Sequence, residues 1–130
     1  MQAGFTTGTP WIAVNPNYTE INVKAEIADA RSVFHYYKKL ITLRKEYPVV
    51  VYGKYEALME ESDELFVYTR TLENEKLLVV CSFCDHEAQF TMLTDFAGAT
   101  CLISNVENVY DKAGMILKPF EAFVLYCKTF

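Results

Sequence analysis

The sequence predicts a mainly β fold, in which an antiparallel β-sandwich follows a long irregular segment and one α-helix. Three observations support this prediction. Residues 3–28 show no strand or helix periodicity, and residues 32–47 repeat apolar side chains at helical spacing. After Pro48 the chain consists of short apolar runs separated by turn-forming residues, a pattern typical of antiparallel sandwiches.

The irregular segment combines turn formers with isolated large apolar residues. Its Gly, Pro and Asn residues surround Phe5, Trp11 and Tyr18. A run of this length without periodicity is uncommon inside a compact domain and usually marks a functional loop or a linker. Disordered linkers are poor in aromatic residues. We therefore expect these aromatic side chains to pack against a surface, of this chain or of another part of a larger protein.

The helix is expected from Ser32 to Tyr47. Ser32 suits the N-cap, and Arg44 and Lys45 in the last turn complement the helix dipole. Pro48 ends the helix because proline disfavours the helical conformation of the residue before it. The apolar face of this helix repeats at intervals of three and four residues, through Val33, Tyr36, Tyr37, Leu40, Ile41 and Leu43.

The strands follow from residue 49 onward. The run Leu77–Cys81 is apolar on both faces, which predicts a central strand, and residues 72–75 read as a hairpin loop. In the strand after residue 87, Ala88, Phe90 and Met92 alternate with polar residues and are expected to face inward. The expected strands are Val49–Tyr52, Lys54–Met59, Leu65–Thr71, Lys76–Phe83, Glu87–Leu93, Ala99–Ser104, Met115–Leu117 and Glu121–Lys128.

Composition and charge exclude several classes of protein. Hydrophobic residues make up 52% of the chain, which argues against disorder. No apolar run is long enough for a membrane span, and no signal peptide pattern is visible, so we expect a cytoplasmic protein. Residues 51–130 hold six Lys and Arg against thirteen Asp and Glu, which disfavours nucleic acid and anionic membranes as partners. The acidic run at residues 60–64 lacks the alternating ligands and Gly of a calcium loop and is expected to be a solvated turn.

The four cysteines are Cys81, Cys84, Cys101 and Cys127. Cys81 and Cys84 form a C-x-x-C pair, but the sequence has no second such pair or His pair to complete a zinc site. We expect small buried apolar residues in a reducing compartment, with a disulfide and a metal or redox role as the alternatives. The sequence therefore predicts no metal ligand and no cofactor.

No catalytic residue is predicted. His35 is expected to be a partly exposed helix residue and His86 a surface turn residue, without the sequence context of a catalytic nucleophile. Asp29, Asp85 and Asp111 lie at expected turns or helix starts, where aspartate commonly makes local hydrogen bonds.

The chain also resembles a known family. Residues 3–23, AGFTTGTPWIAVNPNYTEINV, are similar to the G-F-(T/S)-x-G-x-P-W-x-x-V-N-x-N-Y-x-x-I-N pattern of the α-amylase family of glycoside hydrolases, in its oligo-1,6-glucosidase and α-glucosidase branch. Residues 29–44 resemble the helix that follows this pattern in the family. Residues 117–122, Leu-Lys-Pro-Phe-Glu-Ala, are similar to the L-x-P-(Y/F)-E-A motif of its final domain.

The resemblance implies a domain organisation and a function. Residues 1–48 would be the remnant of a catalytic (β/α)8 barrel, namely the loop after its last strand and its last helix, and residues 49–130 the C-terminal antiparallel β-domain. The family's catalytic carboxylates lie on strands upstream, so this chain would be an accessory part of an α-glucosidase and inactive alone. Its partner would be the barrel, and oligosaccharide would bind only through the parent enzyme.

Two alternatives remain, a carbohydrate-binding module and an interaction or oligomerisation module. Sugar binding by stacking needs exposed aromatic faces. Trp11 lies outside the sandwich, and four strand aromatics are expected in the core, namely Tyr68, Phe90, Phe123 and Tyr126. The loop residues Asn15, Asn17, Tyr18 and Asn22 are expected mostly to fix turns, with direct substrate contact as the alternative.

Without a barrel, the chain would also expose apolar residues. The helix face of Val33, Tyr37, Leu40 and Ile41, together with Phe5 and Trp11, would form an apolar patch larger than soluble monomers usually expose. We therefore expect either self-association through this face or folding of the segment back onto the sandwich.

Overall fold

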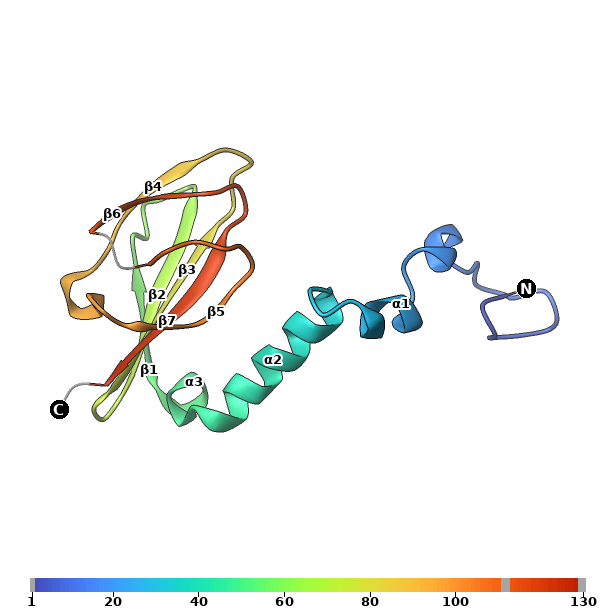
Figure 1. Ribbon diagram of the computed structural model, residues 1–130, viewed down its shortest axis with the longest axis horizontal. Helices are drawn as coiled ribbons and strands as arrows, with labels where there is room; N and C mark the ends of the chain where they lie inside the picture. Colours follow the sequence, from blue (N-terminus) through green and yellow to red (C-terminus); the bar gives the residue numbers. More distant parts are fainter. Residues whose placement is uncertain (1, 111–112, 129–130) are drawn as a thin grey trace. The chain divides into compact units, whose positions relative to one another are not determined.

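The computed structural model describes residues 2–110 and 113–128 (Figure 1). The chain divides into two units, residues 1–38 and residues 39–130. The first unit contains the 3-10 helix η1 (Pro16–Thr19), helix α1 (Val23–Ala28) and the start of helix α2 (Val33–Glu46). The second contains the rest of α2, helix α3 (Pro48–Tyr52), the 3-10 helix η2 (Thr94–Phe96) and all the strands.

Two short helices lie in the segment that the sequence predicts to be irregular. Asn22 caps α1, since its Oδ1 accepts a hydrogen bond from the backbone N of Ala25 at 3.0 Å. Asn15 caps η1 in the same way, and Pro16 occupies the first position of that turn. With six and four residues, α1 and η1 are too short to produce a visible helical period.

The structure confirms the longer helix. α2 runs from Val33 to Glu46, and the hydroxyl oxygen of Ser32 accepts a hydrogen bond from His35 N at 3.5 Å, as an N-cap residue does. The same hydroxyl donates to the carbonyl oxygen of Glu26 at 2.6 Å, which ties the start of α2 to α1. Among the described residues, no helix combines the length and the apolar character that crossing a bilayer requires.

The strands form a five-stranded antiparallel sheet and a two-stranded one. The larger sheet has the order β1-β2-β3-β7-β5, so β3 is the middle strand, as its apolar sequence predicts. The smaller sheet pairs β4 with β6, with Phe90 opposite Met115. The strands are β1 (Lys54–Leu58), β2 (Leu65–Leu72), β3 (Glu75–Ser82), β4 (Ala88–Thr91), β5 (Thr100–Ser104), β6 (Gly114–Leu117) and β7 (Ala122–Lys128).

The main core lies between the two sheets, which confirms the antiparallel sandwich. Its larger-sheet side is formed by alternate residues of β2, β3 and β7, and its other side by the inward residues of β4 and β6. The expected inward residues of β4 and its extension, Ala88, Phe90 and Met92, are all buried. The core residues of β2, β3 and β7 are Leu65, Val67, Leu78, Val80, Phe123 and Leu125.

A second, smaller core covers the opposite face of the larger sheet. Its fully buried members are Val49 of α3, Leu77 of β3 and, nearly as buried, Leu102 of β5. Leu43 and Tyr47 pack against them from the end of α2 and the residue after it. The sheet is therefore apolar on both faces at its centre, which is why β3 carries no polar alternation over residues 77–81.

The prediction of a strand at Val49–Tyr52 is wrong, because this segment forms α3. Pro48 occupies the first turn, where its fixed φ suits a helix and its missing N–H is not needed. The end of α3 is held by Arg70 on β2, whose guanidinium donates hydrogen bonds to three carbonyl oxygens, those of Val49 (3.3 Å), Val51 (3.1 Å) and Gly53 (2.8 Å). A side chain 17 or more residues away thus supplies donors at the end of α3, in addition to Gly53 N, which donates to the carbonyl oxygen of Val49.

The aromatic residues expected in the core divide into two groups. Phe90 and Phe123 are buried in the main core, and Tyr126 packs against the second core. The prediction is wrong for Tyr68, which is half-buried and belongs to neither core. Its ring lies between those of Tyr55 and Phe66, with centroids 5.1 and 5.4 Å away, because residues 66 and 68 of β2 point to the less covered face of the sheet.

Arg70 can be tested by replacement with methionine, which keeps the apolar stem and removes the guanidinium. We expect the free energy of unfolding to fall by about 1–3 kcal/mol, since three partly buried carbonyls lose their charged donor. Urea unfolding followed by circular dichroism measures the effect. The matched control is Lys54→Met, which removes an exposed cation from β1 and should change stability by less than about 0.5 kcal/mol. Equal losses in the two variants would contradict the capping role.

Tyr126 predicts an alkaline limit of stability. Burial, and then the hydrogen bond that its hydroxyl donates to Glu75 at 2.9 Å, raise the pKa of Tyr126 from 10.0 to about 12. The unfolded chain loses this proton at lower pH than the folded protein, so the contribution to stability is complete below pH 10 and is lost as the pH rises toward 12. In Tyr126→Phe, we expect a shallower fall of the urea midpoint over this range. Tyr52→Phe, at an exposed position, is the control and should keep the parent's slope.

Candidate functional site

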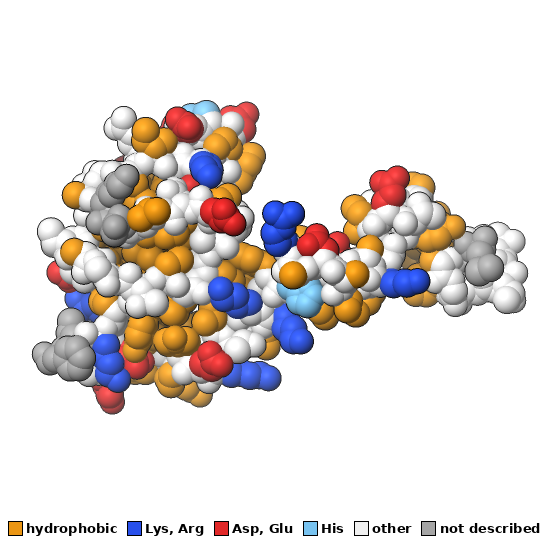
Figure 2. All heavy atoms as spheres, viewed as in Figure 1, with side chains coloured by type: hydrophobic (Ala, Val, Ile, Leu, Met, Phe, Trp, Pro, Cys, Tyr) orange, Lys and Arg blue, Asp and Glu red, His pale blue; other side chains and the backbone are white. Residues whose placement is uncertain are grey.

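The first unit presents large apolar side chains to solvent. Trp11 is 94% exposed and Phe5 is 83% exposed, and six further apolar residues are more than half exposed. We call these eight residues the N-terminal apolar surface. Figure 2 shows hydrophobic side chains of the molecule in orange. Soluble monomers rarely expose so many large apolar side chains in a short segment. The members of the surface are Phe5, Trp11, Ile12, Ile21, Val23, Ile27, Val33 and Tyr37.

The expected helix face is exposed along its length. Val33 and Tyr37 belong to the N-terminal apolar surface, and Leu40 and Ile41 are 37% and 45% exposed. Leu43, one turn further on, instead packs against the second core. The apolar face of α2 therefore has two parts. Its last turn packs against the second core, and the residues Val33, Tyr37, Leu40 and Ile41 before it are exposed.

The polar loop residues of the first unit fix its turns. Both groups of the Asn22 amide are used, since its oxygen caps α1 and its nitrogen donates to the carbonyl oxygens of Tyr18 (3.1 Å) and Thr19 (3.4 Å). The side chain of Asn15 accepts from the backbone N of Asn17 at 3.4 Å. Local hydrogen bonding accounts for the amides of Asn15 and Asn22, and direct contact with a substrate stays a prediction that these contacts do not require.

A hollow of about 680 Å³ lies within this first unit. The aromatic rings of Phe5, Trp11 and Tyr18 contribute to its lining, and its polar groups are hydroxyls and the amide of Asn15. No lining residue carries a carboxyl group. The hollow therefore offers apolar contact and a few neutral hydrogen-bonding groups, but no acid or base for hydrolysis.

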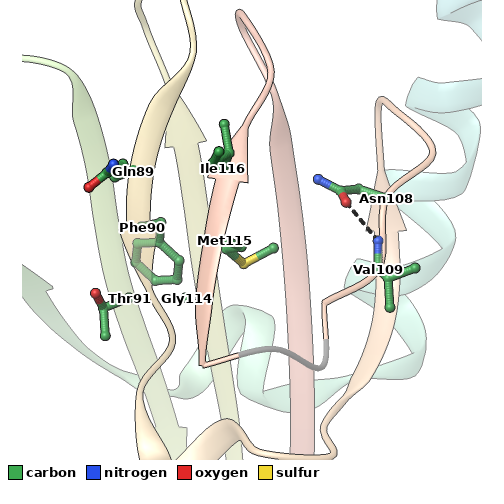
Figure 3. A pocket seen from close by; sticks show the side chains of 8 residues that line it. All are labelled: Gln89, Phe90, Thr91, Asn108, Val109, Gly114, Met115 and Ile116. Carbon is green, nitrogen blue, oxygen red and sulfur yellow. Dashed lines mark hydrogen bonds between the residues drawn. The ribbon is translucent and has the colours of Figure 1, made fainter.

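A second groove, of about 520 Å³, lies over the smaller sheet (Figure 3). Phe90 and Met115 form its floor from β4 and β6, and Gln89, Thr91 and Ile116 lie beside them. Glycoside hydrolysis uses two carboxyl groups on either side of the scissile bond. The described lining residues, which are completed by Asn108, Val109 and Gly114, include no Asp or Glu.

The one fully buried carboxylate among the described residues, Glu121, has a structural role. Its Oε1 accepts from the hydroxyl of Tyr110 at 2.8 Å and from Asn108 Nδ2 at 2.9 Å, and its Oε2 accepts from the backbone N of Lys118 at 2.7 Å. The Tyr110 ring stacks on Phe123 with centroids 4.1 Å apart, and burial raises the pKa of Tyr110. These bonds anchor residues 117–122, the segment similar to the family's final motif, against the main core.

The other predicted polar residues lie where the sequence places them. Asp29 follows α1 and its carboxylate accepts from Arg31 N at 2.9 Å, and Asp85 lies in the turn after β3. Asp111 lies outside the described residues. His35 is half-buried and its Nε2 lies 3.0 Å from the carbonyl oxygen of Ile27. His86 is exposed, and hydrogen bonds to Glu64 and Asp85 raise its pKa.

The cysteines are free thiols, and the prediction that they are buried is wrong, because none of the four is fully covered. Cys81, Cys84 and Cys127 are half-buried, and Cys101 is exposed on β5. Cys84 and Cys127 pack against the main core, and burial raises the pKa of Cys81 and Cys127. The sequence pairs Cys84 with Cys81 in a C-x-x-C motif, whereas the structure brings Glu64 and His86 beside it.

The comparisons with known proteins place these features in a family. The family described as alpha amylase, catalytic domain, matches residues 1–53. The chain is 48% identical over 126 residues to an oligo-1,6-glucosidase of Parageobacillus thermoglucosidasius, covering 94% of this chain and 22% of that protein. It is 44% identical over 125 residues to a trehalose-6-phosphate hydrolase of Bacillus subtilis, covering 93% of this chain and 22% of that protein.

Solved structures agree with the fold. The crystal structure of Bacillus licheniformis trehalose-6-phosphate hydrolase is similar with a TM-score of 0.90 and 38% identity, over 98% of this chain and 24% of that one. The trehalulose synthase MutB of Pseudomonas mesoacidophila gives a TM-score of 0.85 and 35% identity, over 96% and 23%. The chain thus spans less than a quarter of the length of these relatives.

Glu121 can be tested by replacement with glutamine. The amide NH2 group of glutamine then faces at least one N–H or O–H donor that now bonds to the carboxylate, and that hydrogen bond is lost. We therefore expect the free energy of unfolding, measured by urea titration, to fall by about 1–3 kcal/mol. Glu107→Gln is the control, because this substitution removes the same negative charge at an exposed position. A loss shared by both variants would show that charge alone, and not the buried contacts, is responsible.

Proposed function

We propose a function for this chain from the family to which it belongs, the α-amylase family of glycoside hydrolases. The chain is the C-terminal portion of an enzyme of the oligo-1,6-glucosidase branch that hydrolyses α-glucosidic bonds of oligosaccharides. The observation that carries the proposal is the 48% identity over nearly the whole chain to proteins described as oligo-1,6-glucosidases. The match of residues 1–53 to the family's catalytic domain supports it.

The role we propose for this portion is accessory. Residues 1–48 complete the catalytic barrel and residues 49–130 form the β-domain that follows it, while the catalytic carboxylates come from the remainder of the enzyme. Two observations support this role. The two hollows of about 680 and 520 Å³ are lined by no carboxyl group, and the buried Glu121 is fully engaged in hydrogen bonds to its own domain.

The partner we propose for the N-terminal apolar surface is that barrel. Removing apolar side chains from water is the main favourable contribution to such docking, and Trp11, Phe5 and Val33 are each more than three-quarters exposed in this chain. The proposal includes a cytoplasmic location, which the four free thiols support because oxidising compartments favour disulfides.

A chimera tests this proposal. In the oligo-1,6-glucosidase of Bacillus cereus, the matched segment, 48% identical over 130 residues, is replaced by this chain. We expect the chimera to hydrolyse an α-1,6-linked glucose disaccharide, and the chain alone to show no hydrolysis. Introducing Trp11→Asp with Val33→Asp should lower the yield of folded chimera at least about tenfold, since two charges would be buried at the interface.

The matched control is Phe83→Asp with Phe120→Asp, which places two charges at exposed apolar positions outside the N-terminal apolar surface. Light scattering on the chain alone adds a second readout, because an uncovered surface should produce self-association that the Asp pair abolishes. A folded but inactive chimera would overturn the family role, and hydrolysis by the chain alone would overturn the accessory role.

Carbohydrate binding by the chain itself is the second candidate function. The aromatic cluster of Tyr55, Phe66 and Tyr68 favours it, since Tyr55 and Phe66 are nearly half exposed and sugar rings stack on such faces. Calorimetric titration of the chain with malto- and isomalto-oligosaccharides separates the two functions. Saturable binding that Tyr55→Ala removes would favour this candidate, and no heat of binding would favour the accessory role.

A further inference from the structure

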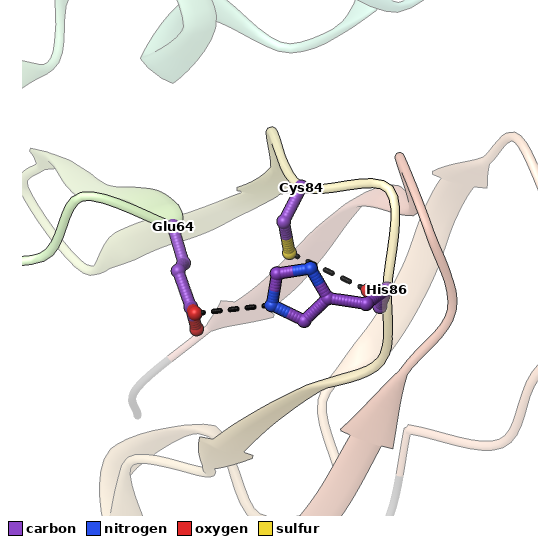
Figure 4. Close-up of side chains that lie close together, drawn as sticks. All are labelled: Glu64, Cys84 and His86. Carbon is purple, nitrogen blue, oxygen red and sulfur yellow. Dashed lines mark hydrogen bonds and ion pairs between the residues drawn. The ribbon is translucent and has the colours of Figure 1, made fainter.

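Three metal-ligating side chains meet at one end of the sandwich. Glu64 lies just before β2, and Cys84 and His86 lie in the turn that connects β3 to β4. One ligand atom from each, a carboxylate oxygen, the thiol sulfur and an imidazole nitrogen, lies within 4.8 Å of the other two (Figure 4). His86 Nε2 already lies 3.1 Å from Glu64 Oε1. No role in the proposed function uses this cluster.

The backbone holds the two segments together independently of these side chains. Phe83 N donates to the carbonyl oxygen of Glu64 at 2.9 Å, next to the β2–β3 ladder. Phe120 N donates to the carbonyl oxygen of Cys84 at 3.1 Å, which ties the turn to the segment before β7. The backbone of Glu64 and of Cys84 is therefore held by the fold, and His86 lies two residues from Cys84 in the same turn.

The ligand set suits zinc. Thiolate sulfur, imidazole nitrogen and carboxylate oxygen are the three ligand types that Zn²⁺ takes in proteins. Tetrahedral zinc with metal–ligand distances of about 2.0–2.3 Å places its ligand atoms roughly 3.3–3.8 Å apart. A contraction of about 1 Å therefore assembles the site. The side chains of His86 and Glu64, 60% and 52% exposed, have solvent around them in which to make this movement.

The surroundings of the cluster favour each ligand. Asp85 Oδ1 lies 3.2 Å from His86 Nδ1, so the ring has a carboxylate partner for one nitrogen while the other binds a metal. Such a carboxylate commonly orients a metal-bound histidine. Cys84 is half-buried against the main core, and its sulfur lies 3.1 Å from the hydroxyl of Ser82, which is able to donate a hydrogen bond to a thiolate.

We propose that Glu64, Cys84 and His86 form a three-ligand binding site for Zn²⁺, with water as the fourth ligand. The ion binds the thiolate of Cys84 and the neutral imidazole of His86. The thiol proton of Cys84 passes to solvent on binding. Bound there, it links the segment before β2 to the turn after β3 and stabilises this end of the sandwich. The site is independent of the proposed glucosidase role, because it lies entirely within residues 64–86.

Calorimetric titration of the 130-residue chain with Zn²⁺ tests the site, in a reducing buffer without chelating thiols. We expect saturable binding of one ion per chain and a rise in melting temperature. Cys84→Ser and His86→Asn should each weaken binding at least about tenfold, and Asp85→Asn by about 10–100-fold. Titration with Co²⁺ should give a thiolate charge-transfer band in the parent that Cys84→Ser abolishes.

The matched control is Cys101→Ser, which removes an exposed thiol on β5 and should leave the affinity unchanged. His86→Asn keeps the test valid if Cys84→Ser fails to fold, since His86 is exposed and its loss opens no cavity. The proposal is overturned if no saturable binding occurs, or if Cys101→Ser and His86→Asn bind zinc equally well. Neither result bears on the chimera described above, so the two proposals fail separately.

Discussion

Strands β3 and β7 lie side by side in the larger sheet, and both faces of this strand pair must be covered by apolar side chains. Leu78 and Phe123 face the smaller sheet, while Leu77 and Val124 face the other way, toward α3. A sheet with two apolar faces is stable only between two layers. The small β4–β6 sheet forms one of these layers, and the end of α2 with α3 forms the other.

The buried carboxylate of Glu121 belongs to the same arrangement. It precedes β7 directly, and the donors that surround it come from residues 108, 110 and 118. An unpaired carboxylate at this buried position would cost several kcal/mol. The loops that supply its donors are therefore kept beside the start of β7. The hydrogen bonds to Glu121 therefore fix residues 108, 110 and 118 relative to the start of β7, whereas apolar packing only brings these segments close together.

The first unit follows a different principle. Its backbone is ordered by short-range hydrogen bonds, from the caps of Asn15 and Asn22 to the contact between Ser32 and Glu26. These bonds satisfy polar groups but bury little apolar area, and Trp11 stays almost fully exposed. Local hydrogen bonding thus gives the segment its shape without the burial that ordinarily stabilises such side chains.

Sequence patterns predict the helix at residues 33–46, the succession along the chain and nearly the bounds of the strands from residue 54, and the family. Periodicity carries the helix and the strands, because a repeat of 2 or 3.6 residues reports which face is buried, whereas motifs such as residues 3–23 and 117–122 carry the family. Three other features depend on contacts between residues far apart in the sequence. Residues 48–52 form a helix because Arg70 caps it from a neighbouring strand, Tyr68 lies outside both cores, and Cys84 meets Glu64, twenty residues away in the sequence, instead of Cys81. Contacts between distant residues leave no period in the sequence.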